Sequence, residues 1–422
     1  MKLLLFFLSG VLMITGGSRR AASASMMGTD STVTAADTTA AKTSAADTSA
    51  SQVPQRDAFD VLNQYVFHRP FEPEASGVTK TGLSWTVLPS LNYNPVYGWA
   101  IGASLSGAGR RGAASFRYSQ LSISGNISTT GQIQAQVRGD LFDHSGNYLL
   151  KADVRYLDTT RSTWGLGPYN PNQEEYPMDY KLVRNYATFY RRTSGPVFVG
   201  FGFHYDEFND IVDSRAEQGE ATPYTTYSGG PVTRSQVSGF SLNVLGDTRD
   251  NLVNPSSGYY LSASFRAYYP EVGSDATWQE IWIEMRLYPH LPSRSRGVLA
   301  FWLFGWTTYG NPPYLSLPSN GWDTYGRGAR GYLQGRIRGA SQFYLETEYR
   351  WPITQDGLWG AVAFINATTT ETDNGILGPP DGAAGLGLRI KFNKRSNTNL
   401  AIDHGWGKSG SKVLFFGMSE TF

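Results

Sequence analysis

From Thr81 to the last residue, apolar and polar positions alternate with a period of two, and clusters of Gly, Pro, Asn and Asp interrupt the alternation. Successive side chains of a β-strand point to opposite faces, so each uninterrupted segment predicts a strand with one apolar and one polar face. Three of the clearest segments begin at Tyr148, Val197 and Ile281. The pattern predicts an all-β protein built from many antiparallel strands.

A soluble β-sandwich would also alternate, so the pattern alone leaves two architectures open. The apolar faces recur over many successive segments, whereas the polar faces carry charged residues and glycines. Tyr and Trp gather near the segment ends, as in the aromatic girdles of membrane barrels, and short turns alternate with long connections near residues 157–179, 207–233 and 309–339. These features favour an antiparallel transmembrane β-barrel of about 16 strands that occupies residues 81–422.

The first part of the chain carries a targeting signal. Residues 1–24 are interpreted as a signal peptide, because a basic start and a short apolar run precede the small residues at positions 22–24. Residues 25–58 are almost wholly Ala, Thr, Ser, Asp and Gln, a composition that predicts a disordered linker. We therefore expect export of the mature chain.

Residues 59–80 form a short lead-in to the first strand. Phe59, Leu62, Tyr65 and Val66 have a helix-like spacing. The lead-in is either a short amphipathic helix, which docks on a partner or plugs the barrel, or an ordinary turn.

Composition narrows the classes of function. Lys and Arg number 36 against 35 Asp and Glu, so the near-neutral charge does not favour a nucleic-acid partner. The absence of Cys excludes disulfides, thiolate metal sites and Cys nucleophiles. The five His residues fit no metalloprotease motif, and the sequence has no nucleophile elbow or phosphate-binding loop. Asp206, Glu207 and Asp210 could bind a cation but are interpreted as a solvated loop. We expect no catalysis, metal or cofactor.

The end of the chain continues the alternation. Leu414, Phe416, Met418 and Phe422 share one face of the last predicted strand, with Glu420 as the exception. A terminal aromatic residue with apolar residues at every second position before it looks like the assembly signal of Gram-negative outer-membrane barrels. The alternative is the edge strand of a soluble sheet, which is normally blunted by charge.

Three stretches carry a more specific resemblance. Residues 245–259 contain Leu-Gly-Asp-Thr-Arg-Asp-Asn and then Pro-Ser-Ser-Gly-Tyr, residues 329–332 read Ala-Arg-Gly-Tyr, and residues 384–389 read Ala-Gly-Leu-Gly-Leu-Arg. Together they resemble the bacterial surface antigen family, which includes the barrels of BamA and TamA. The resemblance covers roughly residues 80–422 and implies a Gram-negative outer-membrane barrel with a long loop inserted into its lumen.

The resemblance also implies roles for residues of that loop. Arg330, Gly331 and Tyr332 would form its tip, and Arg330 would grip Glu348 on the barrel wall. Asn366 stands where the family has an acidic second anchor. An amide still accepts a hydrogen bond but carries no charge, so we expect a weaker or differently arranged clamp. The alternative is an exposed basic loop that meets the phosphates of lipopolysaccharide.

The stretch at residues 245–259 has a structural interpretation. Asp side chains bond to their own backbone in turns, Pro fixes φ, and Gly allows the next strand to start. The residues assigned to this structural turn are Asp247, Arg249, Asp250, Pro255 and Gly258.

The resemblance implies a role in inserting, translocating or organising outer-membrane proteins. Family members with this role carry periplasmic POTRA modules, and the region predicted ahead of the barrel is too short for one. We therefore expect a POTRA-less barrel that meets nascent outer-membrane proteins with the help of a periplasmic accessory protein in trans. Outer-membrane lipids and lipopolysaccharide are the other expected partners. The alternative is a passive or structural barrel, namely a narrow pore, a surface antigen or a scaffold for other proteins.

Overall fold

A computed structural model describes residues 53–71, 82–94, 98–110, 118–292, 295–323, 326–372, 374–394 and 396–422. By its internal contacts the chain divides into Met1–Gln52 and Val53–Phe422. The predicted signal peptide and residues 25–52 of the predicted linker lie outside the described residues, as do residues 72–80 of the predicted lead-in and Thr81. The prediction of disorder is wrong for the end of the linker, because Asp57 caps a helix that begins at Ala58.

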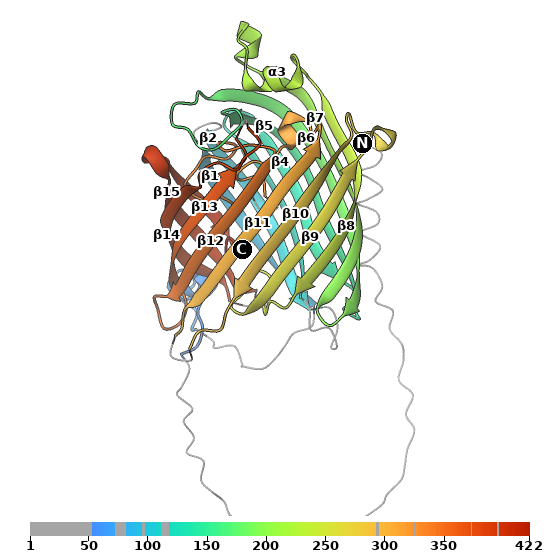
Figure 1. The fold of residues 1–422 in the computed structure, drawn as a ribbon. Helices are drawn as coiled ribbons and strands as arrows, with labels where there is room; N and C mark the ends of the chain where they lie inside the picture. The colour runs from blue at the N-terminus through green and yellow to red at the C-terminus, as the bar shows by residue number, and fades with distance from the viewer. Residues whose placement is uncertain are drawn as a thin grey trace, which may run out of the picture. The chain divides into compact units, whose positions relative to one another are not determined.

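The described chain forms one antiparallel sheet of sixteen strands, each paired with the next in sequence (Figure 1). The strands are β1 (Gly82–Asn94), β2 (Gly98–Arg110), β3 (Tyr118–Ser128), β4 (Ile133–Phe142), β5 (Tyr148–Thr163), β6 (Tyr176–Ser194), β7 (Val197–Asp213), β8 (Ser235–Asp247), β9 (Gly258–Tyr268), β10 (Trp278–Tyr288), β11 (Val298–Gly310), β12 (Ser341–Pro352), β13 (Trp359–Thr370), β14 (Asp381–Asn393), β15 (Thr398–Trp406) and β16 (Lys412–Met418). The prediction of an all-β barrel of about 16 strands is confirmed.

Helices are few and short in the described part of the chain. They are α2 (Ala58–Tyr65), α3 (Pro223–Ser228) and the 3-10 turns η1 (Ala216–Gln218), η2 (Pro270–Val272), η3 (Tyr314–Ser316) and η4 (Lys408–Gly410). None of these helices is long and apolar enough to cross a bilayer.

The two faces of the sheet differ as the alternation predicts. On β7, Phe201 points outward and is 56% exposed, whereas His204 and Asp206 point inward and are buried. The inward face also holds large aromatic side chains, among them Trp302 and Tyr344, which pack against each other with ring centroids 5.2 Å apart. Aromatic residues therefore fill part of the lumen as well as the outer surface.

The two ends of the barrel carry different connections. Every connection that follows an odd-numbered strand reaches the same end of an antiparallel meander. The three long connections all follow odd-numbered strands and are residues 164–175, 214–234 and 311–340. We call this the long-loop end, which carries α3, and the opposite end the short-turn end (Figure 1).

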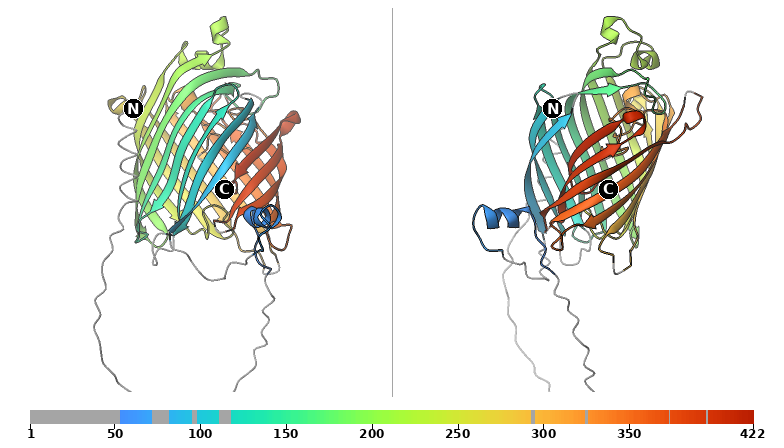
Figure 2. Two further views of the ribbon diagram at one scale, coloured as in Figure 1. Left: turned by 180° about the vertical axis from the view of Figure 1, so that it is seen from behind. Right: turned by 90° about the vertical axis from the view of Figure 1, so that its left-hand side faces the viewer.

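The sheet does not close through its backbone. The strand order runs from β1 to β16, and among the described residues no ladder joins these two edge strands. Both edges lie on the same side of the barrel, β1 in blue and β16 in red (Figure 2). We call the line between them the seam.

Candidate functional site

The connection between β11 and β12, residues 311–340, folds into the barrel, and we call it the lumen loop. Its residues Ala329, Tyr332 and Ile337 are buried in one cluster with Trp302 of β11 and other aromatic residues of the wall. Arg330, Arg336 and Arg338 are buried as well. The loop is therefore internal, and the alternative of an exposed basic loop does not describe it.

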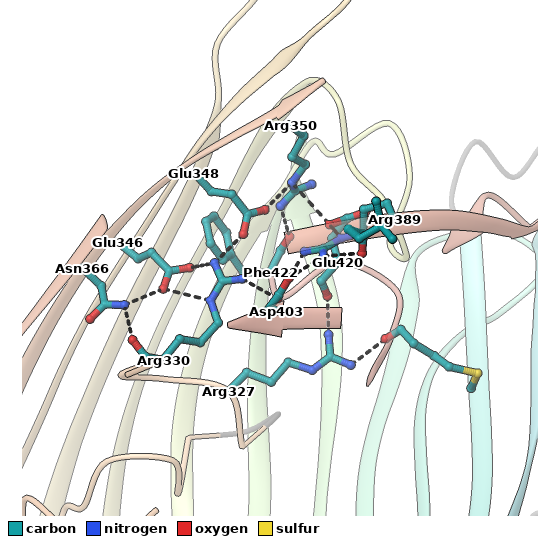
Figure 3. A network of polar contacts seen from close by, with 12 residues as sticks. Arg327, Arg330, Glu346, Glu348, Arg350, Asn366, Arg389, Asp403, Glu420 and Phe422 are labelled. Atoms are coloured by element: carbon teal, nitrogen blue, oxygen red, sulfur yellow. Dashed lines mark hydrogen bonds and ion pairs between the residues drawn. The ribbon is translucent and has the colours of Figure 1, made fainter. Parts of the chain in front are cut away.

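Arg330 lies at the centre of a charged network inside the barrel (Figure 3). Its guanidinium group forms ion pairs with Glu346 and Glu348 on β12. It also donates from Nη1 to Asp403 Oδ2 on β15 at 2.7 Å. The face of the guanidinium lies 3.7 Å from the ring centroid of Phe364. A planar fork of five donors suits this arrangement, because one lysine ammonium could not meet three carboxylates at these angles.

Asn366 has a different role from the one expected. Its Nδ2 donates to the main-chain oxygen of Arg330 at 3.0 Å and to Glu346 Oε2 at 3.2 Å. The amide thus holds the loop backbone as a donor. The second acidic anchor is Asp403, two strands further on, so the clamp keeps its charge through a residue that sequence reasoning did not select.

Gly331 and Tyr332 bring the loop against the wall. Gly331 has φ of +125°, and a Cβ there would lie 2.5 Å from Ala383 Cβ. A Cβ on Gly405 of β15 would lie 2.8 Å from the Gly331 nitrogen, so the contact needs glycine on both sides. The Tyr332 hydroxyl donates to the Gly382 oxygen at 2.7 Å and accepts from the Lys408 N–H at 3.0 Å.

The last residues of the chain correct one expectation. Leu414 and Phe416 are about half exposed on the outer face of β16, as predicted. Phe422 does not share that face, because β16 ends at Met418 and Ser419 takes a positive φ of 69° that turns the chain. Residues 419–422, which we call the tail, enter the lumen, and Phe422 is 3% exposed.

Wall arginines hold the tail inside the barrel. Arg350 Nη2 donates to the main-chain oxygen of Phe422 at 2.9 Å. Arg389 Nε donates to the Glu420 carboxylate at 2.8 Å, and Asn399 Nδ2 donates to it at 2.6 Å. The Phe422 ring packs on Trp302 with centroids 5.3 Å apart, which extends the aromatic cluster under the lumen loop.

Arg327 joins the lumen loop to the tail. Its Nη2 donates to the main-chain oxygen of Met418 at 2.6 Å, and its Nη1 donates to the main-chain oxygen of Glu420. Figure 3 shows this side chain reaching from the loop to the end of β16. Loop, wall and tail therefore form one connected set of contacts, which we call the lumen network.

The predicted structural turn lies beside the tail. Asp247 pairs with Arg249 at 2.8 Å, and Asp250 accepts from the backbone N–H groups of two serines in the turn. Gly258 has φ of +94°, and a Cβ there would lie 2.3 Å from the Thr248 oxygen. The Pro255 oxygen accepts from Arg350 Nη1 at 3.2 Å, so the turn also supports the arginine that holds Phe422.

The three carboxylates weighed as a cation site lie on β7 and not in a solvated loop, and Asp206 is buried. Each of them has its own cationic partner. Asp206 pairs with Arg184, Glu207 with Arg234 and Asp210 with Lys181, at 2.7, 2.9 and 2.8 Å. Within the described ranges, no group of three or more His, Asp or Glu side chains is placed to hold a metal ion.

Comparison with known proteins adds evidence on the fold. No protein-family model matches the sequence, and no curated protein matches it. Among solved structures, BamA from Haemophilus ducreyi lacking POTRA domains 1–3 matches with a TM-score of 0.50 and 14% identity, over 80% of this chain and 70% of that one. The chain therefore has a BamA-like barrel fold.

Two CdiB structures are also similar. CdiB from Acinetobacter baumannii matches at a TM-score of 0.47 and 13% identity, and CdiB from Escherichia coli at 0.49 and 12%. Both matches cover 79% of this chain, which spans only 59% and 61% of the two CdiB chains.

Proposed function

We propose that this chain is an outer-membrane barrel of the BamA type, exported through its signal peptide, that helps other membrane proteins to insert or to cross. The observation that supports the proposal is the seam, since β1 and β16 form no ladder in the described structure. Each unpaired backbone group in hydrocarbon costs several kcal/mol, so membrane barrels normally close. A barrel with two free edges can accept the strand of a client protein by β-augmentation.

Features of β16 keep the backbone groups of this edge strand available for pairing with another strand. β16 is 7 residues long, whereas β1 has 13. At the end of β16 the Met418 oxygen accepts from Arg327, which competes with any ladder to β1. Leu414 and Phe416 point outward from this edge without a protecting charge between them. An incoming apolar strand would meet both free backbone groups and a lipid-facing surface.

The lumen network explains how the edge stays in place without its neighbour. Contacts of the tail with Arg327, Arg350 and Arg389 fix the end of β16 from inside the barrel. The lumen loop thus acts both as a plug and as a support for the seam. On this proposal a periplasmic accessory protein delivers the client, while lipids and lipopolysaccharide surround the barrel.

A site-specific photo-crosslinker tests the proposal. The probe is placed at Phe416, on the outer face of β16, and at Ile365, which also points outward but lies on β13, three strands away from β16. The expected result in cells is adducts with nascent outer-membrane proteins at Phe416 and none at Ile365. Adducts at neither position, or at both in equal yield, would contradict the proposal.

Depletion of the protein separates the two classes of function. An assembly role predicts lower levels of other outer-membrane barrels after depletion. A passive pore, surface antigen or scaffold predicts unchanged levels. Unchanged levels together with an absence of adducts at Phe416 would replace the proposal by the passive barrel.

A further inference from the structure

The short helix α2 docks on the outside of the barrel. The Phe59 ring packs edge-on against Phe392 with centroids 4.9 Å apart. Phe392 lies at the irregularity near the end of β14, a few residues beyond Leu386 and Leu388, which are exposed on the outer face. Figure 2 shows the helix, in blue, beside the wall at the short-turn end. The described part of the lead-in therefore does not plug the lumen.

Polar groups attach the helix to the barrel. Asp60 forms an ion pair with Lys394 of the β14–β15 turn at 2.7 Å. Asp57 caps the helix and also accepts from the Lys394 N–H at 3.0 Å. The Arg56 N–H donates to the Asp356 oxygen in the β12–β13 turn at 3.1 Å, which fixes the entry to the helix.

The apolar side of the helix faces away from the protein. Leu62 and Val66 lie on the same side as Phe59, three and seven residues along, and are 44% and 58% exposed. Tyr65 and Phe67 next to them are also exposed. A helix of a globular protein packs its apolar stripe inward and leaves its polar residues in water. Apart from the Phe59 ring, α2 has the opposite arrangement, because Asp57 and Asp60 contact the barrel whereas Leu62 and Val66 are exposed.

The exposed face continues a surface that already meets lipid. Phe59 lies on Phe392, and the outward row on β14 runs from there to Leu388 and Leu386. Exposed Trp359 and Ile353 mark the same end of the neighbouring strands. The contact between Phe59 and Phe392 joins α2 to this row, so the same apolar solvent fits both.

We propose that α2 and the two residues that follow it form an interfacial anchor, in which Leu62, Val66 and Phe67 are covered by phospholipid in the leaflet at the short-turn end. A short amphipathic helix lies in the interface plane, with its apolar side chains in the acyl region and its polar groups above. Exposed Arg69 follows the apolar residues and is placed to meet lipid phosphate. The inference rests on the proposed membrane location of the barrel but not on a role in assembly.

The absence of Cys allows a direct depth measurement. Single variants Leu62→Cys, Val66→Cys and Gln64→Cys are labelled with an environment-sensitive dye in the full chain. The labelled protein is reconstituted in phosphatidylethanolamine and phosphatidylglycerol vesicles that contain lipids spin-labelled near the headgroup. Gln64 is the matched control, because its position on α2 is opposite to that of Leu62 and Val66. Quenching should be about twofold stronger at Leu62 and Val66 than at Gln64, with blue-shifted emission.

A fourth variant, Ile365→Cys, reports on the barrel itself. Strong quenching there by lipids labelled deep in the acyl chain shows that the barrel is folded and inserted. If Ile365 is quenched while Leu62 and Val66 emit as in water, the anchor is refuted and the barrel location stands. If Ile365 is not quenched, the membrane location fails, and the anchor with it. Self-quenching at Leu62 that disappears on dilution with unlabelled protein would assign the face to a second copy and would also refute the inference.

Discussion

Replacement of Arg330 by methionine should destabilise the barrel by about 3–5 kcal/mol, the usual cost of removing one partner from a buried ion pair. Methionine keeps much of the side-chain volume and removes only the charge and the donors. Arg330, Glu346 and Glu348 are almost completely buried, so water cannot replace the lost contacts.

Most of the lost stability should come from one carboxylate that is left without a cationic partner. Without Arg330, Glu348 still pairs with Arg350, and Asp403 still pairs with Arg389. Glu346 would keep only the hydroxyl of Tyr344 and the amide of Asn366 as donors. Glu346→Gln in the Arg330→Met background removes that stranded charge and should recover about 1–3 kcal/mol, a typical coupling energy for residues in contact.

The free energy of unfolding is measured by denaturant titration of the barrel in phospholipid vesicles, followed by tryptophan fluorescence. Arg336→Met is the matched control on the same loop, because Arg336 donates only to the neutral groups of Gln173 and Asn170. That variant should lose less stability, and Glu346→Gln should not restore it. An Arg330→Met variant as stable as Arg336→Met, or one that Glu346→Gln leaves unchanged, would refute the reasoning.

Three further predictions follow from the same network. Gly331→Ala should weaken the docking of the loop by more than the about 1–2 kcal/mol of a residue forced to positive φ, because its Cβ would also clash with Ala383. Gly167→Ala is the control for the backbone cost in the same titration, because Gly167 has a similar φ of +108° and a Cβ there would meet nothing within 4 Å. Burial raises the pKa of Glu420, but Arg389 and Arg350 outweigh it and hold the pKa at about 2. The ionised Glu420 therefore contributes its full stabilisation above its ordinary pKa near 4.5, and this contribution is lost as the pH falls toward 2. Glu420→Gln should make the free energy of unfolding depend less on pH between these two values, as measured by acid unfolding. Deletion of residues 322–338 should raise the single-channel conductance in planar bilayers, and an unchanged current would exclude the lumen loop as the plug.

The barrel could be predicted from the sequence because its two environments impose a strict alternation. On β10, parity alone places Ile283 toward lipid and Glu284 inside, and both lie as predicted. Parity gives the face but not the neighbours across the lumen, so the aromatic packing of Trp302 could not be anticipated. The prediction of faces from the alternation was wrong for the tail, because the strand ends before Ser419, which has a positive φ, while the apolar pattern continues to Phe422.

The candidate site was predictable only in part. The motif at residues 329–332 and the parity of Glu348 were enough to suggest their contact, and the structure places the two side chains together. Asp403 could not be found in this way, because it lies 73 residues from Arg330 and reaches it only through the curvature of the barrel wall. Asn366 was selected by position, but its direction of hydrogen bonding depends on where the loop backbone lies.

The contact between Arg330 and Asp403 also constrains the order in which the chain can fold. The guanidinium group precedes β12, and its last carboxylate arrives with β15, after β12, β13 and β14 have been synthesised. Phe422 packs beside Trp302 in the same buried cluster as Ala329 and Tyr332 of the loop. We therefore expect the docking of the loop and of the tail to be coupled. A chain stalled before β15 would carry an arginine with an incomplete set of partners, a distinct intermediate that quality-control proteases could recognise.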